Sequence, residues 1–380
     1  MDLFDTPERR ELRETTRRFT LKEIVPNIDQ WERDQALPLD LHRKAAELGL
    51  LGLGFPEEIG GSGGDSIDVH VVTEAIIESG GSSGLLASLF THGIGLPHIA
   101  TAGNPDHIER FVKPALAGEK IVSLAVTEPD GGSDVANLRT TAKRDGDEFI
   151  VNGAKTYITS GTRADFVTTA VRTGDAGYGG ISLLVIEKGT PGFTVSRKLE
   201  KLGWWCSDTA ELAFTDCRVP AANLVGAEHG GFVQLMQQFQ NERVGLAVHA
   251  YAIAQRCLDL TLEWCRARET FGRPLISRQV VQHKLVEMFR AVDVARTYTR
   301  QVAIRVAAGE VIIPQVCLAK KNATDACTFV VDQAVQLHGG MGYMRESEVE
   351  RHYRDARILP IGGGADEVML DLAAKTLGYK

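Results

Sequence analysis

The sequence contains no run of about 18 apolar residues, the length that a helix needs to cross a bilayer, so no membrane span is expected. Its six cysteines form no C-x-x-C pair and have no histidine at a zinc-binding spacing, which predicts reduced packing residues rather than disulfides or a metal site. The formal net charge is −8, and this acidic balance argues against nucleic acid as a partner because phosphates would be repelled. A globular protein that binds neither metal nor nucleic acid is therefore expected.

The first 18 residues contain five arginines, but five aspartate and glutamate residues balance them. Transit peptides are rich in arginine and poor in acidic residues, so this segment does not resemble one. We therefore expect a cytoplasmic protein, and a bacterial cytoplasm fits the sequence best. The alternative is a processed form in the mitochondrial matrix.

Hydrophobic periodicity divides the 380 residues into three parts and predicts an α+β fold. Residues 1–120 are expected to form a helical domain. Residues 121–229 are expected to form a small antiparallel β domain, a barrel or sandwich, because short strand-like runs alternate there with Asp-Gly and Asn-Gly turns. Residues 230–380 return to a helical period and predict a helical bundle, with long segments near 231–268, 277–307, 312–337 and 365–377. Because β and α units do not alternate, a doubly wound nucleotide-binding fold is excluded.

Helix ends in the first part are marked by capping residues. Thr6 and Asn104 each precede a proline, and such a pair suits the start of a helix. Helix C-termini are predicted at three glycines, Gly49, Gly80 and Gly118.

A glycine-rich segment runs from Leu124 to Asp134 with the sequence LAVTEPDGGSD. The hydroxyls of Thr127 and Ser133, together with backbone N–H groups near the two glycines, can hold a pyrophosphate or the edge of a heterocycle. An ordinary β-turn is the alternative, and the segment by itself favours it.

Tyr157 and Thr159 are expected on the same side of one strand, because side chains alternate along a strand. An aromatic ring beside a hydroxyl can stack on a flat ring and bond one of its nitrogens. A plain tyrosine and threonine face of a sheet is the alternative, and this pair alone favours it.

A helix starting after Gly231 carries an apolar stripe that Glu242 interrupts. The stripe has helical spacing and consists of Phe232, Leu235, Met236, Phe239, Leu246 and Ala250. A carboxylate on a face meant for burial costs free energy unless it is paired or functional, and burial raises its pKa toward the range of a general base. The alternative is a structural ion pair with a distant arginine, since the adjacent Arg243 does not face it on a helix. The residues alone favour neither the general base nor the structural ion pair.

Three further segments lie near predicted helix ends. RARETFGRPL, followed by Gln279, contains Arg268, which can meet a phosphate but can equally serve helix-end electrostatics. QLHGGMGY follows a helix rather than a strand, so it is not a dinucleotide fingerprint, and His338 in it is expected to be structural. IGGGADEV precedes the last helix, where free N–H groups can polarise a carbonyl, with a flexible loop as the alternative.

Taken in order, these segments resemble the acyl-CoA dehydrogenase family along essentially the whole chain. The matching stretches are VTEPDGGSD, TYITSG, LGWWCSDTAELAFTDCRVP, RETFGRPL, QLHGGMGY and RDARILPIGGGADEV. The resemblance implies an N-terminal helical domain, a middle β domain and a C-terminal four-helix bundle. It also implies FAD lying between the β domain and the bundle, a homotetramer built as a dimer of dimers, and an electron-transfer flavoprotein as the electron acceptor.

The resemblance also implies roles for individual residues. Flavin or thioester contacts are expected at Leu124, Val126, Thr127, Gly132, Ser133, Tyr157, Thr159, Ala365 and Glu367. The adenine and pyrophosphate of a partner subunit's FAD are expected at Arg268, Thr270, Phe271, Gln279, Gln336, Gly339 and Gly340. Substrate contacts are expected from Ser133, Gln240 and Arg243, although Gln240 stands where some members have aspartate.

One departure from the family pattern decides where the catalytic base is expected. Most members carry it as the glutamate of a Y-E-G-T loop before the last helix, and that position is Gly363 here. A minority, similar to the isovaleryl-CoA, long-chain and citronellyl-CoA dehydrogenases, keeps the base on an earlier bundle helix within an E-R pair. Here that pair is Glu242 and Arg243. The resemblance and the interrupted stripe therefore point to the same carboxylate.

The expected reaction is FAD-dependent α,β-dehydrogenation of an acyl-CoA to the trans-2-enoyl-CoA in acyl catabolism. The resemblance implies that Glu242 takes the pro-R α-proton, that hydride passes from Cβ to flavin N5, and that the Gly363 N–H binds the thioester carbonyl together with a ribityl hydroxyl. An acyl-CoA oxidase-type enzyme, a nitroalkane-oxidising relative and a non-catalytic acyl-CoA-binding member are the alternatives. The acyl chain is left open between a short branched chain and a long or terpenoid-like one.

Overall fold

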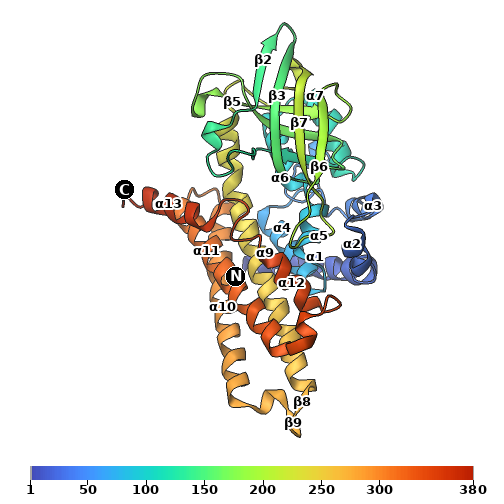
Figure 1. Cartoon of the computed structure of the whole chain (residues 1–380), viewed down its shortest axis with the longest axis vertical. Helices are drawn as coiled ribbons and strands as arrows, with labels where there is room; N and C mark the ends of the chain where they lie inside the picture. The colour runs from blue at the N-terminus through green and yellow to red at the C-terminus, as the bar shows by residue number, and fades with distance from the viewer. Residues whose placement is uncertain (1, 380) are drawn as a thin grey trace.

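The computed structural model describes residues 2–379, and these residues form three parts (Figure 1). A β-sheet lies at one end of the molecule, the N-terminal helices lie beside its base, and long C-terminal helices extend to the opposite end. The predicted α+β architecture of helices, then a β domain, then a helical bundle is confirmed. Across residues 2–379, no helix combines the length and the apolar character that crossing a membrane requires.

The N-terminal part is helical, and its predicted caps are present. Thr6 accepts a hydrogen bond from the Arg9 N–H, and the Asn104 side chain accepts from the backbone just after it. The three predicted C-terminal glycines all have positive φ, between 71° and 102°. The α-helices are α1 (Pro7–Phe19), α2 (Ile28–Asp34), α3 (Leu39–Glu47), α4 (Ser66–Glu78), α5 (Ser83–Leu89), α6 (His92–Ala102), α7 (Pro105–His107) and α8 (Lys113–Leu116).

The middle part is one curled sheet of seven strands. They are β1 (Val122–Ala125), β2 (Thr141–Asp145), β3 (Glu148–Thr159), β4 (Phe166–Arg172), β5 (Ile181–Glu187), β6 (Phe193–Lys198) and β7 (Thr209–Pro220). The hydrogen-bonded order is β1-β4-β2-β3-β7-β6, with β5 on the other side of β4.

Two features of the sheet differ from the hairpin pattern that the sequence suggests. β1 pairs with β4 in parallel, because the β2–β3 hairpin stands between them in the chain and returns it to the same direction. The EFIVNG and TYITS runs, expected as separate strands, form the single strand β3. Register shifts near Gly153 and Tyr157 let this strand continue past its turn-like residues.

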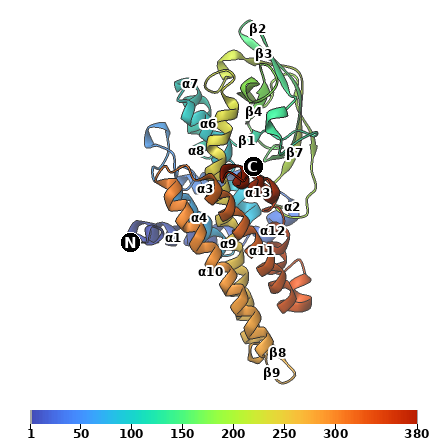
Figure 2. The same ribbon diagram turned by 90° about the vertical axis from the view of Figure 1, so that its left-hand side faces the viewer.

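The C-terminal part contains the four predicted helical segments. They are α9 (Gly231–Ala267), α10 (Gln279–Ala307), α11 (Ile313–His338) and α13 (Asp366–Thr376). The three long helices pack together, and a short hairpin of β8 (Glu269–Thr270) and β9 (Arg273–Pro274) closes their far end (Figure 2). Helix α12 (Glu348–Ala356) was not anticipated, because its buried face includes Arg351, His352 and Asp355 and so lacks an apolar period.

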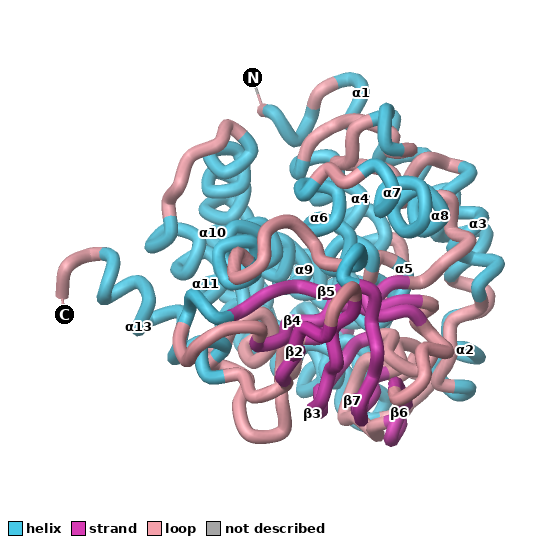
Figure 3. Tube along the Cα trace, turned by 90° about the horizontal axis from the view of Figure 1, so that it is seen from above, coloured by secondary structure: helices cyan, strands magenta, loops and turns pink. Residues whose placement is uncertain are grey.

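Helix α9 connects the three parts. Seen from above, it lies between the N-terminal helices and the other bundle helices, with the sheet alongside (Figure 3). Its first turns pack under the sheet, where Gly231 meets the backbone of β5 so closely that a Cβ would not fit. Any group on the early turns of α9 is therefore held near both the sheet and the N-terminal helices.

Candidate active site

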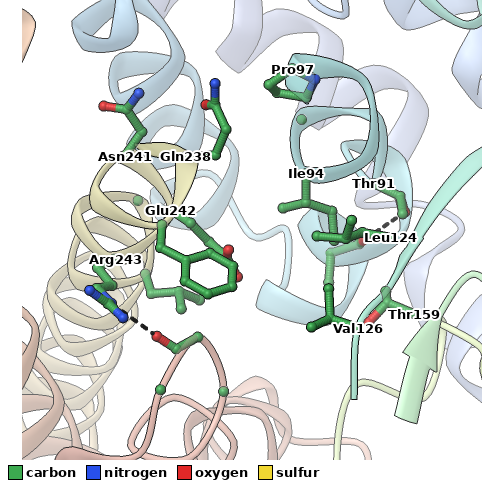
Figure 4. A pocket seen from close by; sticks show the side chains of 18 of the residues that line it. Thr91, Ile94, Pro97, Leu124, Val126, Thr159, Gln238, Asn241, Glu242 and Arg243 are labelled. Atoms are coloured by element: carbon green, nitrogen blue, oxygen red, sulfur yellow. Dashed lines mark hydrogen bonds between the residues drawn. The ribbon is translucent and has the colours of Figure 1, made fainter. Parts of the chain in front are cut away.

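A cavity of about 2090 Å³ lies where the three parts meet. Its walls come from α4, α5 and α6 on one side, β1 and β3 on another, and α9 with the loop before α13 on a third. Figure 4 shows α9 and α6 facing each other across this space. The predicted site residues that line it are Leu124, Val126, Thr127, Gly132, Ser133, Tyr157, Thr159, Glu242, Arg243, Gly363 and Ala365.

A second group of predicted residues lies at the far end of the bundle instead. It consists of Arg268, Thr270, Phe271, Gln279, Gln336, Gly339 and Gly340, and none of these lines the cavity. Trp264 at the end of α9 stacks on His338 at the end of α11, with ring centroids 5.1 Å apart, so the two predicted segments meet. Phe271 in the hairpin is 97% exposed. The group is thus gathered in one place but remote from the cavity of its own chain.

Two predicted contacts do not reach the cavity. The Gln240 side chain turns away and donates a hydrogen bond to the Glu310 carbonyl at 3.2 Å, whereas Gln238 and Asn241 beside it line the cavity. A helix turns about 100° per residue, so neighbours on α9 face different directions. Glu367 is exposed on α13, on a face that does not line the cavity.

Glu242 faces the cavity from α9 as a half-buried carboxylate (Figure 4). Within residues 2–379 it makes no hydrogen bond or ion pair, and the nearby cations Arg243 and Lys320 act on it only at longer range, so the alternative of a structural ion pair finds no partner there. Burial raises the pKa of Glu242, and the positive charges of Arg243 and Lys320 oppose part of that rise. An unpaired, desolvated carboxylate open to a cavity has the environment that a general base requires.

Gly363 lies directly across from this carboxylate. A Cβ built on Gly363 would be 3.5 Å from Glu242 Oε1 and would overlap Leu246 Cδ1, while the backbone φ of 64° also favours glycine. A side chain at this position would therefore need the Leu246 side chain to move, and its backbone would be strained. The carboxylate of α9 reaches the space toward which a side chain at 363 would point.

Two cations hold the carbonyls of this loop. Arg243 Nε donates a long hydrogen bond of 3.4 Å to the Gly363 carbonyl, and Lys320 Nζ donates to the Gly364 carbonyl at 2.6 Å. Lys320 is fully buried on α11, and burial lowers its pKa to about 8. With both carbonyls held from behind, the N–H groups of the loop are constrained in direction.

The β-sheet wall is held by a second buried lysine. Lys155 on β3 is fully buried and donates to Glu128 Oε1 at 2.8 Å and to the Val126 carbonyl at 3.0 Å. Glu128 also accepts from the Arg139 and Thr140 N–H groups. This network ties the glycine-rich segment to β3.

The register shift after Lys155 turns Tyr157 into the cavity. Tyr157 has a φ of 60° and is 69% exposed, an open position for an aromatic ring. Thr159 follows on the same wall, and its carbonyl accepts from the Ser123 hydroxyl of β1 at 2.8 Å. Both residues line the cavity, although the register shift at Tyr157 interrupts the regular alternation of side chains along β3.

The sheet wall fits a flat heterocycle with polar edges. The hydroxyls of Thr127, Ser133 and Thr159 line the cavity and make no hydrogen bond with residues 2–379. Gly131 has open space where a Cβ would stand, so a ligand can approach the backbone closely. An exposed aromatic ring beside free hydroxyl groups suits the isoalloxazine and ribityl parts of FAD.

Sequence reasoning missed the two lysines. Lys155 stands in NGAKTY and Lys320 in LAKKNA, where polar neighbours hide the fact that each lysine is fully buried. Their partners are a glutamate and a backbone carbonyl that lie 27 and 44 residues away in the chain. Such pairing is set by packing and leaves no local pattern.

Comparisons with known proteins cover the whole of this arrangement. The models of the acyl-CoA dehydrogenase N-terminal, middle and C-terminal domains match residues 6–119, 123–217 and 229–378. The mitochondrial long-chain specific acyl-CoA dehydrogenase of Rattus norvegicus is 37% identical over 96% of this chain and 85% of its own. A probable acyl-CoA dehydrogenase from Mycobacterium abscessus has a crystal structure with 63% identity, a TM-score of 0.98, and coverage of 99% of this chain and 100% of its own. A glutaryl-CoA dehydrogenase from Mycobacterium smegmatis in complex with FADH2 matches with 27% identity and a TM-score of 0.93, covering 100% of this chain and 97% of its own.

Proposed function

This chain belongs to the acyl-CoA dehydrogenase family of FAD-dependent oxidoreductases, and we propose that it converts an acyl-CoA to the trans-2-enoyl-CoA with Glu242 as the base. The observation that carries the proposal is the unpaired Glu242 carboxylate facing Gly363 across the cavity. Gly363 cannot remove a proton, whereas the carboxylate beside it can. Catalysis of this kind contributes about 10²–10⁴-fold to a rate.

The loop before α13 supplies the second part of the proposed chemistry. Its backbone N–H at Gly363 would donate to the thioester carbonyl and stabilise negative charge there while Glu242 takes the α-proton. Arg243 and Lys320 hold the carbonyls of the loop, which supports a fixed direction for that N–H. Arg243 acts here as a positioning residue, in addition to lining the substrate cavity.

We assign the sheet wall to FAD. Tyr157 and Thr159 would lie against the isoalloxazine, and Thr127 and Ser133 would bond its polar parts from the glycine-rich segment. FAD, when bound, supplies the acceptor for the hydride that leaves Cβ. The acyl-CoA would therefore lie between the sheet wall and Glu242, with water excluded from the space around the carboxylate.

The far end of the bundle is proposed to serve a neighbouring subunit. The segments around Arg268 and Gln336 are brought together there but cannot reach the cavity of their own chain. They would hold the adenine and pyrophosphate of a partner subunit's FAD in a homotetramer. An electron-transfer flavoprotein would then be the electron acceptor.

Anaerobic titration with acyl-CoA tests the proposed function. A panel of CoA thioesters should bleach the flavin absorbance of the purified holoenzyme and yield enoyl-CoA, detected by mass spectrometry. Binding of thioesters without bleaching would support the non-catalytic alternative and contradict the proposal. Rapid reoxidation of the reduced enzyme by oxygen would instead support an oxidase.

Replacing Lys320 with methionine should slow flavin reduction about tenfold to hundredfold, because a charge-assisted hydrogen bond to the Gly364 carbonyl is lost. The loss of a positive charge near Glu242 should also raise the pKa of that carboxylate. The rising limb of the pH–rate profile should therefore move to higher pH. Stopped-flow reduction measured across pH checks both effects.

Lys284→Met is the matched control. Lys284 bonds Gln333 between two bundle helices and does not line the cavity, so the pH profile should not move. An equal shift in both variants, or none in Lys320→Met, would show that Lys320 has only a general packing role.

A further inference from the structure

Past Glu242, the cavity is lined by residues of α4 and α9, two helices that run in the same direction where they meet. Successive contacts show the direction: the Tyr251 hydroxyl bonds Glu74, and one turn further Arg256 Nη1 donates to the Glu78 carbonyl. Both helices therefore lead from the level of the proposed base toward the interior of the bundle. An acyl chain whose Cα lies at Glu242 has this space for its tail.

The channel ends at a level marked by two histidines. His249 lies seven residues after Glu242 on the same face of α9, a rise of about 10 Å. His70 on α4 also lines the cavity, and the two rings are close enough to interact electrostatically. Beyond this level Glu74 is fully buried and bonded by Tyr251 and Arg300, which closes the channel.

The wall at this depth is otherwise mainly apolar. Thr73 lies one turn beyond His70, but its hydroxyl already donates to the Val69 carbonyl at 3.0 Å. The facing side chains from α5 and the following turn include Leu86, Ala87 and Phe90. Two imidazoles at the end of an apolar channel are therefore the groups there with hydrogen-bonding capacity to spare.

His249 is bonded through one of its two ring nitrogens. Trp204 Nε1 can only donate, and it donates to the Ser83 hydroxyl oxygen at 3.1 Å. That hydroxyl also bonds His249 Nδ1 at 3.2 Å, and because its oxygen has two lone pairs it can either donate to Nδ1 or accept from it. Burial lowers the pKa of His249 to about 4, so the ring is neutral near pH 7. In either tautomer His249 Nε2 makes no hydrogen bond with residues 2–379, so it is free to bond a ligand.

His70 has a free Nε2 as well. Only 5% of its surface is exposed, and burial lowers its pKa to about 4. Neither ring nitrogen has a hydrogen-bond partner in residues 2–379, but Nδ1 is sealed from the cavity, so Nε2 is the nitrogen that a ligand can reach. A buried polar group left without a partner costs about 1–3 kcal/mol. Both rings line one cavity and lie within electrostatic range of each other, which indicates that a substrate there can bond the free Nε2 atoms.

We propose that the preferred acyl chain carries a neutral oxygen function, a hydroxyl or a ketone, where its tail reaches His249 and His70. This inference rests on the proposed function and names the substrate class for that same site. Neutral rings suit an uncharged oxygen better than a carboxylate, which would need a cation beside it. The tail must be long enough to span the rise from Glu242 to His249.

The test uses CoA thioesters of graded chain length in matched pairs, with either a methyl or a hydroxyl group at the ω position. Anaerobic flavin reduction of the holoenzyme is measured for each pair, and Kd is measured by calorimetry in the Glu242→Gln background. At the chain length that reaches the two histidines, the hydroxyl compound should bind roughly tenfold more tightly than its methyl partner. Shorter pairs should show no preference.

His249→Phe and His70→Leu should each reduce this preference to near unity while the ω-methyl thioesters still bleach the flavin. Ser83→Ala keeps both rings but removes the hydroxyl that bonds His249 Nδ1 and so holds the ring in place, and it should weaken the preference in part. His98→Phe is the matched control: His98 is buried and lines the cavity from α6, the helix that packs on β1 and β4. It should leave the hydroxyl-to-methyl ratio unchanged.

The outcomes separate this inference from the proposed function. If no thioester bleaches the flavin, the proposed function fails and the inference fails with it. If methyl and hydroxyl thioesters bind and react alike at every length, or if an ω-carboxylate is preferred, only the inference is overturned.

Discussion

Replacing Glu242 with glutamine is expected to slow flavin reduction by acyl-CoA by about 10²–10⁴-fold, because an amide cannot accept the α-proton. The substitution keeps the size of the side chain, and Glu242 has no hydrogen-bond or ion-pair partner in residues 2–379 that would be lost. FAD content and the Kd for acyl-CoA should therefore change little. Stopped-flow absorbance under anaerobic conditions measures the rate.

Glu263→Gln is the matched control, since it removes an exposed carboxylate from the same helix, away from the cavity. Its reduction rate should equal that of the wild type. If the flavin of Glu242→Gln were bleached as fast as that of the wild type, Glu242 would not be the base. The cavity wall at this position would then provide no carboxylate for the family reaction.

The difference in stability between the wild type and Glu242→Gln should depend on pH, because Glu242 is buried. Because burial raises the pKa of Glu242 above its ordinary value of 4.5, the folded state binds this proton more tightly than the unfolded chain. The contribution of Glu242 to the free energy of unfolding therefore falls as pH rises from 4.5 to the raised pKa. Glutamine does not titrate, so Glu242→Gln should be more stable than the wild type above that window and similar below it. Thermal unfolding measured at stepped pH checks the sign.

Replacing Gly363 with alanine is expected to lower both stability and activity. The φ of 64° costs an L-residue about 1–2 kcal/mol, and the overlap of the new Cβ with Leu246 adds about 1–3 kcal/mol. A shifted loop would also misplace the N–H proposed to bind the thioester carbonyl, and loss of such a donor slows a reaction about 10²–10³-fold. Chemical denaturation and flavin reduction rates measure the two effects.

Two further variants separate the cost of the positive φ from the cost of the overlap between the new Cβ and Leu246. Gly309 has a φ of 84° and nothing within 4 Å of a Cβ, so Gly309→Ala should show the backbone cost alone. Adding Leu246→Ala to Gly363→Ala removes the collision and should recover part of the rate. If Gly363→Ala reacts like the wild type, the loop does not supply the carbonyl contact.

The local features of the fold followed from short-range patterns. Helices α9, α10, α11 and α13 lie within a few residues of their predicted bounds, because a helical period and its caps are properties of neighbouring residues. Helix α12 could not be predicted from an apolar period, because charged side chains occupy its buried face. These side chains form ion pairs instead of apolar contacts.

The candidate site also has some features that the sequence predicts and others that only the structure shows. A carboxylate on an apolar helix stripe and a glycine before the last helix are visible in the chain itself, and together they singled out Glu242. The distance between the two could not be read from the chain, since it depends on how α9 packs against a loop 120 residues later. The substrate contact expected of Gln240 failed for the same reason, because its side chain turns to the Glu310 carbonyl while the next residue, Asn241, lines the cavity.

By itself, then, the sequence determined the three-part order of the chain, the long helices and the two residues between which the proposed chemistry takes place. Only the tertiary structure decided that Lys155 and Lys320 hold the two walls, that β1 runs parallel to β4, and that His70 and His249 both line the cavity. The reason is physical: periodicity and capping act within a few residues, whereas a buried charge or imidazole is defined by groups that folding brings from distant parts of the chain.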